Sequence, residues 1–195
     1  HDVVREPRAA KAHLGLVPQE IALYEEVSAR ENLRYWGGTY GLRGKELQLR
    51  IEEVLDVVGL RDRAQEPVSR FSGGMKRRLN LAAGIVHGPE VLLLDEPTVG
   101  VDPQSRRNLL ERIRDQAERG VTVLYTTHYM EEAEKLCDEL AIIDHGRLLA
   151  QGTLEALRKE AGERDVVRLE GLFDPAEVRR RLEGLPGTEV LEAGE

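Results

Sequence analysis

The chain has 195 residues, of which 41% are hydrophobic and 33% charged, and its formal net charge is −8. This composition excludes a disordered or fibrous chain, and the length suffices for one well-buried domain with a small appendage. The acidic balance disfavours nucleic acid as a partner, because neutralising phosphates requires a basic surface.

The sequence offers neither an internal disulfide nor a membrane-spanning segment. Its single cysteine, Cys137, fits a reducing compartment. No apolar run approaches the roughly 20 residues that a transmembrane helix needs. The start at His1 is charged, broken by proline and unlike a signal peptide, and the lack of an initial methionine suggests a fragment or a processed chain.

The first part of the chain predicts one strand followed by helices. Residues 13–17 are typical of a short strand. Ser28 and Glu31 have the spacing of a capping box, which predicts a helix beginning there. Residues 45–58 carry apolar side chains at helical spacing. We therefore expect a mainly helical subdomain over about residues 20–80.

The middle of the chain alternates between helix and strand. The pattern predicts a helix over 72–87, a strand over 91–95, a helix after Pro103 and a strand over 121–126. Residues 91–94 are uniformly apolar, which predicts a strand covered on both faces, as in a parallel sheet.

The pattern then continues with a helix over 129–137 and a strand over 140–144, joined by a tight turn to 147–150 as a hairpin. Such alternation indicates an α/β fold with a mostly parallel sheet. We expect a first domain over 1–162 and a partial β-α-β accessory domain over 163–195.

The segment from Ser72 to Met75 predicts an anion site. Ser72 is placed as a helix N-cap, and Gly73 and Gly74 leave backbone N–H groups unobstructed at the positive end of the helix dipole. Phosphate is the anion that such a helix start commonly binds. The alternative is a flexible turn before an ordinary helix.

Two adjacent carboxylates, Asp95 and Glu96, end the strand over 91–95. They are expected at the carboxyl edge of the sheet, where α/β proteins bind ligands. Because successive strand side chains point to opposite sides, the two should have different roles. One can hold Mg²⁺ and the other can polarise an attacking water. The alternative is a solvated strand end.

Two further polar side chains follow neighbouring strands. His128 follows the strand over 121–126, so it should lie on the same edge as Glu96, where it could donate to a phosphate or orient water. Gln19 follows the strand over 13–17 and could reach Mg²⁺ or the water. A lone histidine is more often a structural hydrogen-bonding residue, and Gln19 alone indicates nothing.

Taken together, these motifs resemble the nucleotide-binding domain of ATP-binding cassette (ABC) proteins over roughly residues 1–160. The resemblance implies a P-loop NTPase-like fold with an inserted helical subdomain. It also implies a role for each matching residue, as follows: Gln19 as the Q-loop glutamine that couples Mg²⁺ to a membrane partner; Ser72, Gly73, Gly74 and Met75 as the signature motif that contacts ATP held by a second subunit; Asp95 as the Walker B aspartate that binds Mg²⁺; Glu96 as the catalytic glutamate; Asp102 as the D-loop aspartate; and His128 as the switch histidine.

The same resemblance implies ATP and Mg²⁺ as cofactors and an ATPase that acts as a dimer, or with a related subunit. It implies an integral membrane permease subunit as partner and a peripheral location at the cytoplasmic face of the membrane. The signature contains Met75 where the commonest form has glutamine, which resembles the drug, lipid and polysaccharide exporter branch. Methionine cannot replace the amide contacts of glutamine.

The phosphate loop of that family should precede Gln19 by several dozen residues, and the residues before Gln19 do not form it. The nearest match, over 39–46, has Thr39 in place of its first glycine and Glu46 in place of the hydroxyl that binds Mg²⁺. We therefore expect these 195 residues alone to bind ATP poorly and to be inactive.

Two alternatives belong to other classes of protein. A soluble, non-transport ABC ATPase would contain a coiled-coil insertion or a second cassette, and neither is visible in this sequence. The acidic charge also disfavours action on nucleic acid. A non-catalytic module that has lost nucleotide binding is disfavoured by the presence of both Glu96 and His128.

Overall fold

The structure is a computed structural model that describes residues 1–162 together with 177, 180 and 181. The chain divides into two compact units, residues 1–154 and a second unit that begins at Glu155. The strands expected within the partial β-α-β domain over 163–195 lie outside the described residues. The domain boundary expected after residue 162 stays a prediction.

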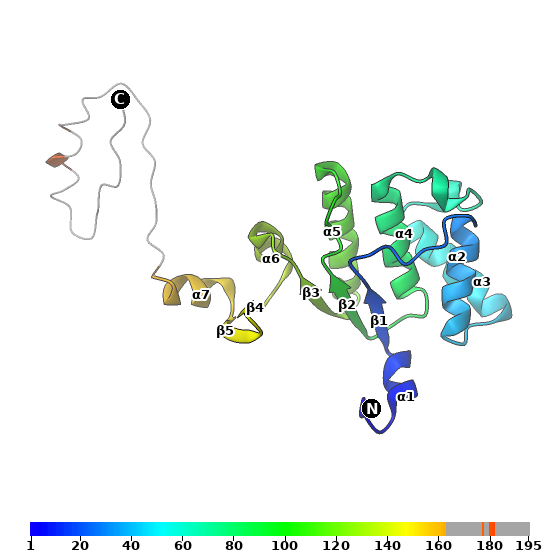
Figure 1. Ribbon diagram of the computed structural model, residues 1–195, viewed down its shortest axis with the longest axis horizontal. Coiled ribbons are helices and arrows are strands. Elements are labelled where there is room, and N and C mark those ends of the chain that lie inside the picture. The colour runs from blue at the N-terminus through cyan, green and yellow to red at the C-terminus, as the bar shows by residue number, and fades with distance from the viewer. Residues whose placement is uncertain (163–176, 178–179, 182–195) are drawn as a thin grey trace. The chain divides into compact units, whose positions relative to one another are not determined.

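Three parallel strands form the central sheet of the first unit. They are β1 (Leu14–Val17), β2 (Val91–Asp95) and β3 (Thr122–Thr126), in the order β1-β2-β3. Val17 pairs with Leu94, and Asp95 pairs with Thr126, so the carboxyl ends of the strands meet at one edge (Figure 1). The three predicted strands and their parallel arrangement are confirmed.

The helices largely follow the predicted pattern. The first unit contains α1 (Pro7–Ala12), α2 (Ala29–Thr39), α3 (Gly44–Val57), α4 (Gly73–Ile85), α5 (Pro103–Glu118) and α6 (Met130–Leu136), with short 3₁₀ turns at Arg61–Arg63 and Val68–Arg70. Helix α7 (Leu154–Glu160) crosses the boundary into the second unit. The sequence analysis missed α1, a six-residue helix with proline in its first turn.

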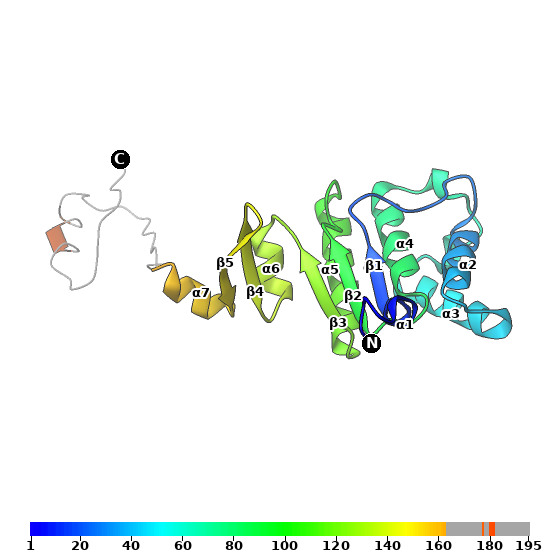
Figure 2. The ribbon, with the colours of Figure 1, turned by 60° about the horizontal axis from the view of Figure 1, so that its bottom comes forward.

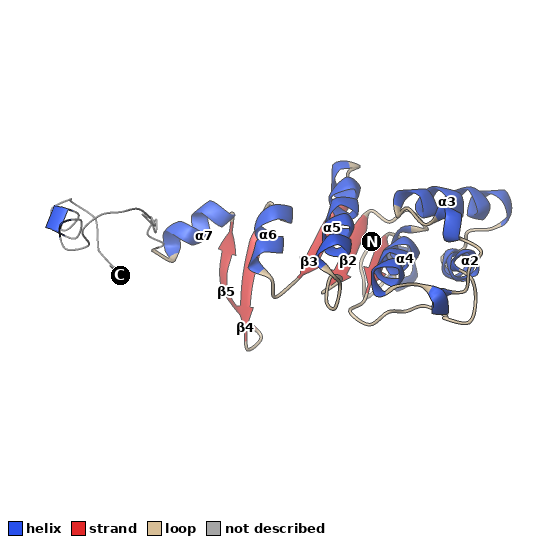
Figure 3. Ribbon diagram, turned by 90° about the horizontal axis from the view of Figure 1, so that it is seen from above, coloured by secondary structure: helices blue, strands red, loops and turns tan. Residues whose placement is uncertain are grey.

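The helices α2, α3 and α4 lie together beside the sheet (Figure 3). The predicted capping box is present, because the Ser28 side chain accepts from Glu31 N over 3.2 Å and Glu31 Oε2 accepts from Ser28 N over 2.9 Å. Leu33, Ile51 and Leu55 are fully buried between these helices. The helical subdomain is thus a packed unit with its own apolar core.

Two glycines allow α4 to lie directly against β1. A Cβ atom on Gly15 would lie 2.4 Å from the Gly84 carbonyl oxygen, and one on Gly84 would lie 2.6 Å from Val17 Cγ2. Neither distance is possible for a real side chain. Helix α4 therefore lies directly against β1, the strand that leads to Gln19.

The two faces of the sheet differ in burial. Leu92 and Leu94 are fully buried on the face that packs against α4 and α5, which lie behind the strands in Figure 2. On the opposite face Leu16 is 56% and Leu124 61% exposed, and Leu93 between them is only half-buried. The expectation that residues 91–94 are covered on both faces is therefore wrong for the described chain, because no described element packs over Leu16 and Leu124.

Strands β4 (Leu140–Asp144) and β5 (Arg147–Gly152) form a separate antiparallel pair. His145 and Gly146, at the turn between them, both have positive φ, as tight hairpin turns require. The predicted hairpin is confirmed. Among the described strands β4 pairs with β5 only, so the parallel sheet has three strands.

Candidate functional site

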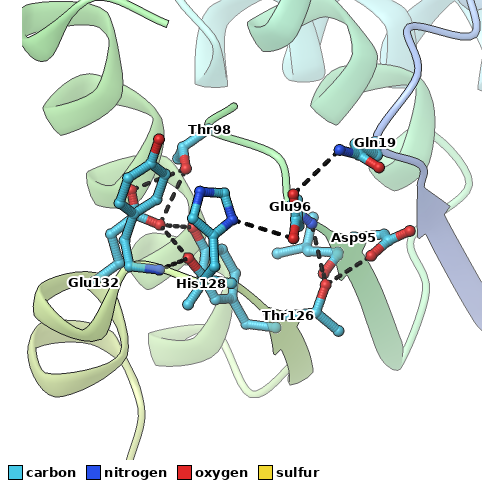
Figure 4. Close-up of polar contacts among 11 residues, drawn as sticks. Gln19, Asp95, Glu96, Thr98, Thr126, His128 and Glu132 are labelled. Atoms are coloured by element: carbon cyan, nitrogen blue, oxygen red, sulfur yellow. Dashed lines mark hydrogen bonds and ion pairs between the residues drawn. The ribbon is translucent and has the colours of Figure 1, made fainter. Parts of the chain in front are cut away.

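Three polar side chains converge at the carboxyl edge of the sheet (Figure 4). Gln19 Nε2 donates to Glu96 Oε2 over 3.1 Å, and His128 Nδ1 lies 3.2 Å from Glu96 Oε1. Each residue follows a different strand, so the parallel register brings together positions that are 77 and 32 residues apart in the sequence. The predicted neighbourhood of Gln19, Glu96 and His128 is present.

Thr126, the last residue of β3, contacts the side chain of Asp95 and the backbone of Glu96. Its hydroxyl donates to Asp95 Oδ1 over 2.7 Å and accepts from Glu96 N over 3.1 Å. Glu96 has φ of 43°, a left-handed conformation that a non-glycine residue adopts at a cost of roughly 1–2 kcal/mol. This conformation turns Glu96 toward Gln19 and His128, while Asp95 faces Thr126.

Asp95 and Glu96 supply oxygen ligands of the kind that Mg²⁺ prefers, without making a complete metal site by themselves. Among the described residues, no three His, Cys, Asp or Glu side chains gather as a metal site. Asp95 is exposed, and only its Oδ1 accepts the Thr126 hydrogen bond. Mg²⁺ in phosphate-processing sites takes one or two carboxylates and completes its shell with water and phosphate oxygens. The donor set present fits such a shared site.

The loop that carries Gln19 is hydrogen-bonded to helices α2 and α4. Asn80 Oδ1, on α4, accepts from Ala22 N over 3.1 Å, and Trp36 Nε1, on α2, donates to Ala22 O over 3.1 Å. Arg77 donates to the Gln19 carbonyl oxygen. The position of Gln19 relative to Glu96 therefore depends on α2 and α4.

The segment from Ser72 to Met75 forms a separate site at the start of α4. Ser72 is the N-cap, and its side chain accepts from Met75 N over 3.3 Å. Ser72 and Gly73 are exposed, and a Cβ atom on Gly73 would meet nothing within 4 Å. Gly74 is buried, and Met75 packs partly against the core. The open side of this helix start is thus formed by Ser72 and Gly73.

Asp102 lies beside this helix start. It caps α5 by accepting from Ser105 N over 2.9 Å and from Gln104 N over 3.1 Å. The hydrogen bond from Ser105 N is the main reason that the pKa of Asp102 lies below its usual range, so its carboxylate remains ionised. A Cβ atom on Gly74 would lie 2.3 Å from Ser105 Oγ and 3.8 Å from Asp102 Oδ2, so only glycine fits between the two helices.

The predicted site residues therefore form two clusters. Gln19, Asp95, Glu96 and His128 lie at the edge of the sheet, whereas Ser72, Gly73, Gly74, Met75 and Asp102 lie around the starts of α4 and α5. Arg77 links the two regions, because its guanidinium donates to the carbonyl oxygen of Gln19 and, over 3.0 Å, to that of Val99.

The sequence analysis missed three residues that build the site: Arg77, Thr126 and Glu132, whose carboxylate accepts from the hydroxyl groups of Thr98 and Thr127 near Glu96 and His128. Thr126 could have been found, since a hydroxyl at a strand end beside two carboxylates is a natural hydrogen-bond partner. Glu132 gave no signal, because it is one of several carboxylates on a short charged helix.

This combination of a parallel sheet, a carboxylate pair at its edge and a capped glycine pair on a neighbouring helix is typical of an ATP-binding subunit. The family model described as ABC transporter matches residues 1–99, half of the chain. The chain belongs to the ABC transporter family.

Characterised relatives are bacterial resistance and export proteins. The linearmycin resistance ATP-binding protein LnrL of Bacillus subtilis is 50% identical over 85% of this chain and 53% of its own length. The daunorubicin resistance ATP-binding protein DrrA3 of Streptomyces coeruleorubidus is 43% identical over 83% and 51%. The Nod factor export ATP-binding protein I of Sinorhizobium fredii is 39% identical over 95% and 62%. The chain thus spans between half and two thirds of these relatives.

Solved structures confirm the predicted P-loop NTPase-like α/β fold class. The structure of an ATP-binding subunit of an ABC transporter matches with a TM-score of 0.73 and 31% identity, over 85% of this chain and 69% of that one. CbiO1 of Clostridium perfringens, part of the ABC transporter complex CbiONQ, matches with a TM-score of 0.72 and 25% identity over 93% and 69%. In the described part of the chain, no helix is long and apolar enough to span a bilayer.

Proposed function

We propose that this chain is the ATP-hydrolysing part of an ABC exporter subunit that drives a separate membrane permease. The observation that carries the proposal is the position of Glu96, whose two carboxylate oxygens are held by Gln19 and His128 at the edge of a parallel sheet. A carboxylate fixed in this way is suited to take a proton from an attacking water.

In this proposal the carboxylates at the edge have separate roles. Asp95 would hold Mg²⁺, which would supply positive charge to the phosphates of bound ATP. Glu96 accepts the proton of the water that attacks the γ-phosphate. Gln19 and His128 orient Glu96, His128 also donates to the γ-phosphate, and ADP is the leaving group. The chemistry needs little beyond such positioning and charge stabilisation.

We also propose that the start of α4 serves a second subunit. Ser72 and Gly73 present a helix N-terminus to solvent, away from the contacts that hold Glu96. Backbone N–H groups there, with the helix dipole, suit the γ-phosphate of ATP bound by that subunit. Gly74, Met75 and Asp102 support this start, and the active form is a dimer of this chain or a pair with a related subunit.

The membrane permease would contact the loop that begins at Gln19 and the neighbouring helix α2. Tyr24 and Tyr35 are 46% and 49% exposed there, and their rings meet edge to face at 4.9 Å. Aromatic side chains of this kind are enriched in protein interfaces. A subunit docked there would sit peripherally at the cytoplasmic face of the membrane, and its movement would reach Glu96 through Gln19.

Export is favoured over import by the relatives, whose names refer to antibiotic resistance and Nod factor export. A polypeptide of only these 195 residues is proposed to bind Mg-ATP weakly, because the phosphate loop of the family is not among the residues before Gln19. A soluble, non-transport ATPase and a module without nucleotide binding are the competing functions.

The test uses the protein as its gene encodes it, together with its permease in vesicles. Glu96→Gln should lower the rate of ATP hydrolysis about 100- to 1,000-fold, because an amide cannot accept the proton. Glu131→Gln is the matched control, since the side chain of Glu131 is 89% exposed, and it should change the rate less than twofold. Hydrolysis by Glu96→Gln at the wild-type rate would contradict the proposal.

A further inference from the structure

The carboxylate of Glu132, on α6, is the most completely enclosed acidic group near the site. The residue is 3% exposed. Its oxygens accept hydrogen bonds from three hydroxyl groups. The Thr98 hydroxyl lies 2.9 and 3.0 Å from the two oxygens, and the hydroxyl groups of Thr127 and Tyr125 lie 3.0 and 2.7 Å from Oε2. Arg106 Nε lies 3.5 Å away and supplies a positive charge. A buried carboxylate requires such partners, because its desolvation is otherwise costly.

The hydroxyl partners come from the two segments that carry the reactive side chains. Thr98 is buried and lies two residues after Glu96. Thr127 directly precedes His128, and its hydroxyl also accepts from Tyr129 N over 3.0 Å. Glu132 therefore links the loop after β2 to the loop after β3 through hydrogen bonds to both (Figure 4).

Two further partners complete the network around Glu132. Tyr125 lies on β3, and burial raises the pKa of its phenol with the Glu132 hydrogen bond adding to the rise, so the hydroxyl stays a donor. Arg106 lies on α5, one turn after the Asp102 cap, with its guanidinium carbon 4.4 Å from the centre of the Tyr129 ring. The network thus joins α5, α6 and both reactive loops.

We propose that Glu132 is a positioning residue for ATP hydrolysis, which sets the distance between Glu96 and His128 by holding Thr98 and Thr127 on one carboxylate. The inference rests on the proposed function, since it concerns the same site. Glu132 itself is buried and does not touch the substrate. A gap of 3.2 Å between His128 Nδ1 and Glu96 Oε1 leaves little tolerance for a shift of either loop.

The experiment replaces Glu132 by glutamine, which has the same shape but presents an NH₂ group to hydroxyl and guanidinium donors. We expect Glu132→Gln to lower kcat at least 10-fold, with the KM for ATP within threefold of the wild type. The control is Glu131→Gln, the same change one residue earlier at an exposed position, which should leave kcat within twofold. The rate of hydrolysis is divided by the concentration of folded protein, which circular dichroism measures.

A second background separates positioning from a general loss of structure. In Glu96→Gln protein, measured under single-turnover conditions, adding Glu132→Gln should change the residual rate less than twofold, because the group that it positions is already gone. Wild-type kcat in Glu132→Gln, or an equal loss in both backgrounds, would overturn the inference. Wild-type turnover in Glu96→Gln alone would instead overturn the proposed function.

Thr127→Val provides an independent variant should Glu132→Gln fail to fold. It keeps the Glu132 carboxylate but removes one of the hydroxyl groups that donate to it. We expect it to lower kcat by a smaller factor than Glu132→Gln does. Thr122→Val, at the exposed first residue of β3, is its control. Equal kcat in Thr127→Val and the wild type would overturn the inference.

Discussion

Glu96 and Glu132 are two carboxylates of one network with opposite surroundings. The side chain of Glu96 is 29% exposed and has two side-chain partners, Gln19 and His128. The side chain of Glu132 is 4% exposed, and three hydroxyl groups and a guanidinium surround it. The contrast separates the group that can meet a substrate from the group that can only hold others in place. It also predicts which changes should alter activity alone and which should alter stability.

His128→Ala should break the exposed half of this comparison. It removes the side chain on one oxygen of Glu96, and we expect kcat for ATP hydrolysis to fall about 10- to 100-fold with the melting temperature unchanged. The measurement is steady-state hydrolysis together with thermal unfolding. His145→Ala, at a side chain that is 94% exposed, is the control and should leave both unchanged. A wild-type kcat in His128→Ala would mean that His128 takes no part in ATP hydrolysis.

Gly84→Ala tests stability without touching either carboxylate, at the contact between α4 and β1. The added methyl group would lie 2.6 Å from Val17 Cγ2 and 3.2 Å from the Leu16 carbonyl oxygen, so α4 and β1 must separate. We expect the free energy of unfolding to fall by about 1–3 kcal/mol, as for other overpacked sites. Chemical denaturation measures it.

Gly38→Ala is the matched control, because a Cβ atom on Gly38 would meet nothing within 4 Å. Alanine favours a helix by up to about 1 kcal/mol over glycine, so this variant should be slightly stabilised. Equal destabilisation by the two substitutions would show that the close contact of α4 with β1 does not matter for stability.

The smallest expected effect concerns His87, which follows α4. Burial lowers the pKa of His87, and the nearby Arg50 lowers it further, while the hydrogen bond to the Leu14 carbonyl oxygen opposes the shift. A histidine with a lowered pKa binds a proton more readily when unfolded. Stability should therefore decrease as the pH falls through the unfolded pKa of about 6.5, and should be unaffected by this group above it.

His87→Gln should make the free energy of unfolding less dependent on pH between about 5 and 7. His145→Gln, at an exposed position, should leave the dependence as in the wild type. Unfolding curves at several pH values measure both. A wild-type pH dependence in His87→Gln would mean that another group causes the loss of stability.

Much of the site could be predicted because its residues follow strands. Asp95 ends its strand, Gln19 and His128 each lie two residues beyond theirs, and parallel strands bring such positions to one edge. The capped glycine pair at Ser72 was equally visible, since capping depends on local sequence. The fold class followed from the same alternation of strand and helix.

The rest depended on tertiary packing. Glu131 and Glu132 are chemically identical neighbours on α6, yet one side chain is 89% exposed and the other 4%. No local pattern distinguishes them, because the difference arises from where β3 and α5 lie. The apolar segment 91–94 was similarly ambiguous, because it contains the same residue types on the buried and the half-exposed face of the sheet.

Glu96 is proposed to act in cleaving ATP and not in binding it. The most direct measurement is a single-turnover experiment with radiolabelled Mg-ATP on the protein that its gene encodes, with the permease present. We expect Glu96→Gln to bind ATP within threefold of the wild-type affinity but to cleave it at least 100-fold more slowly. Cleavage at the wild-type rate, or a loss of binding that accounts for the whole effect, would contradict it.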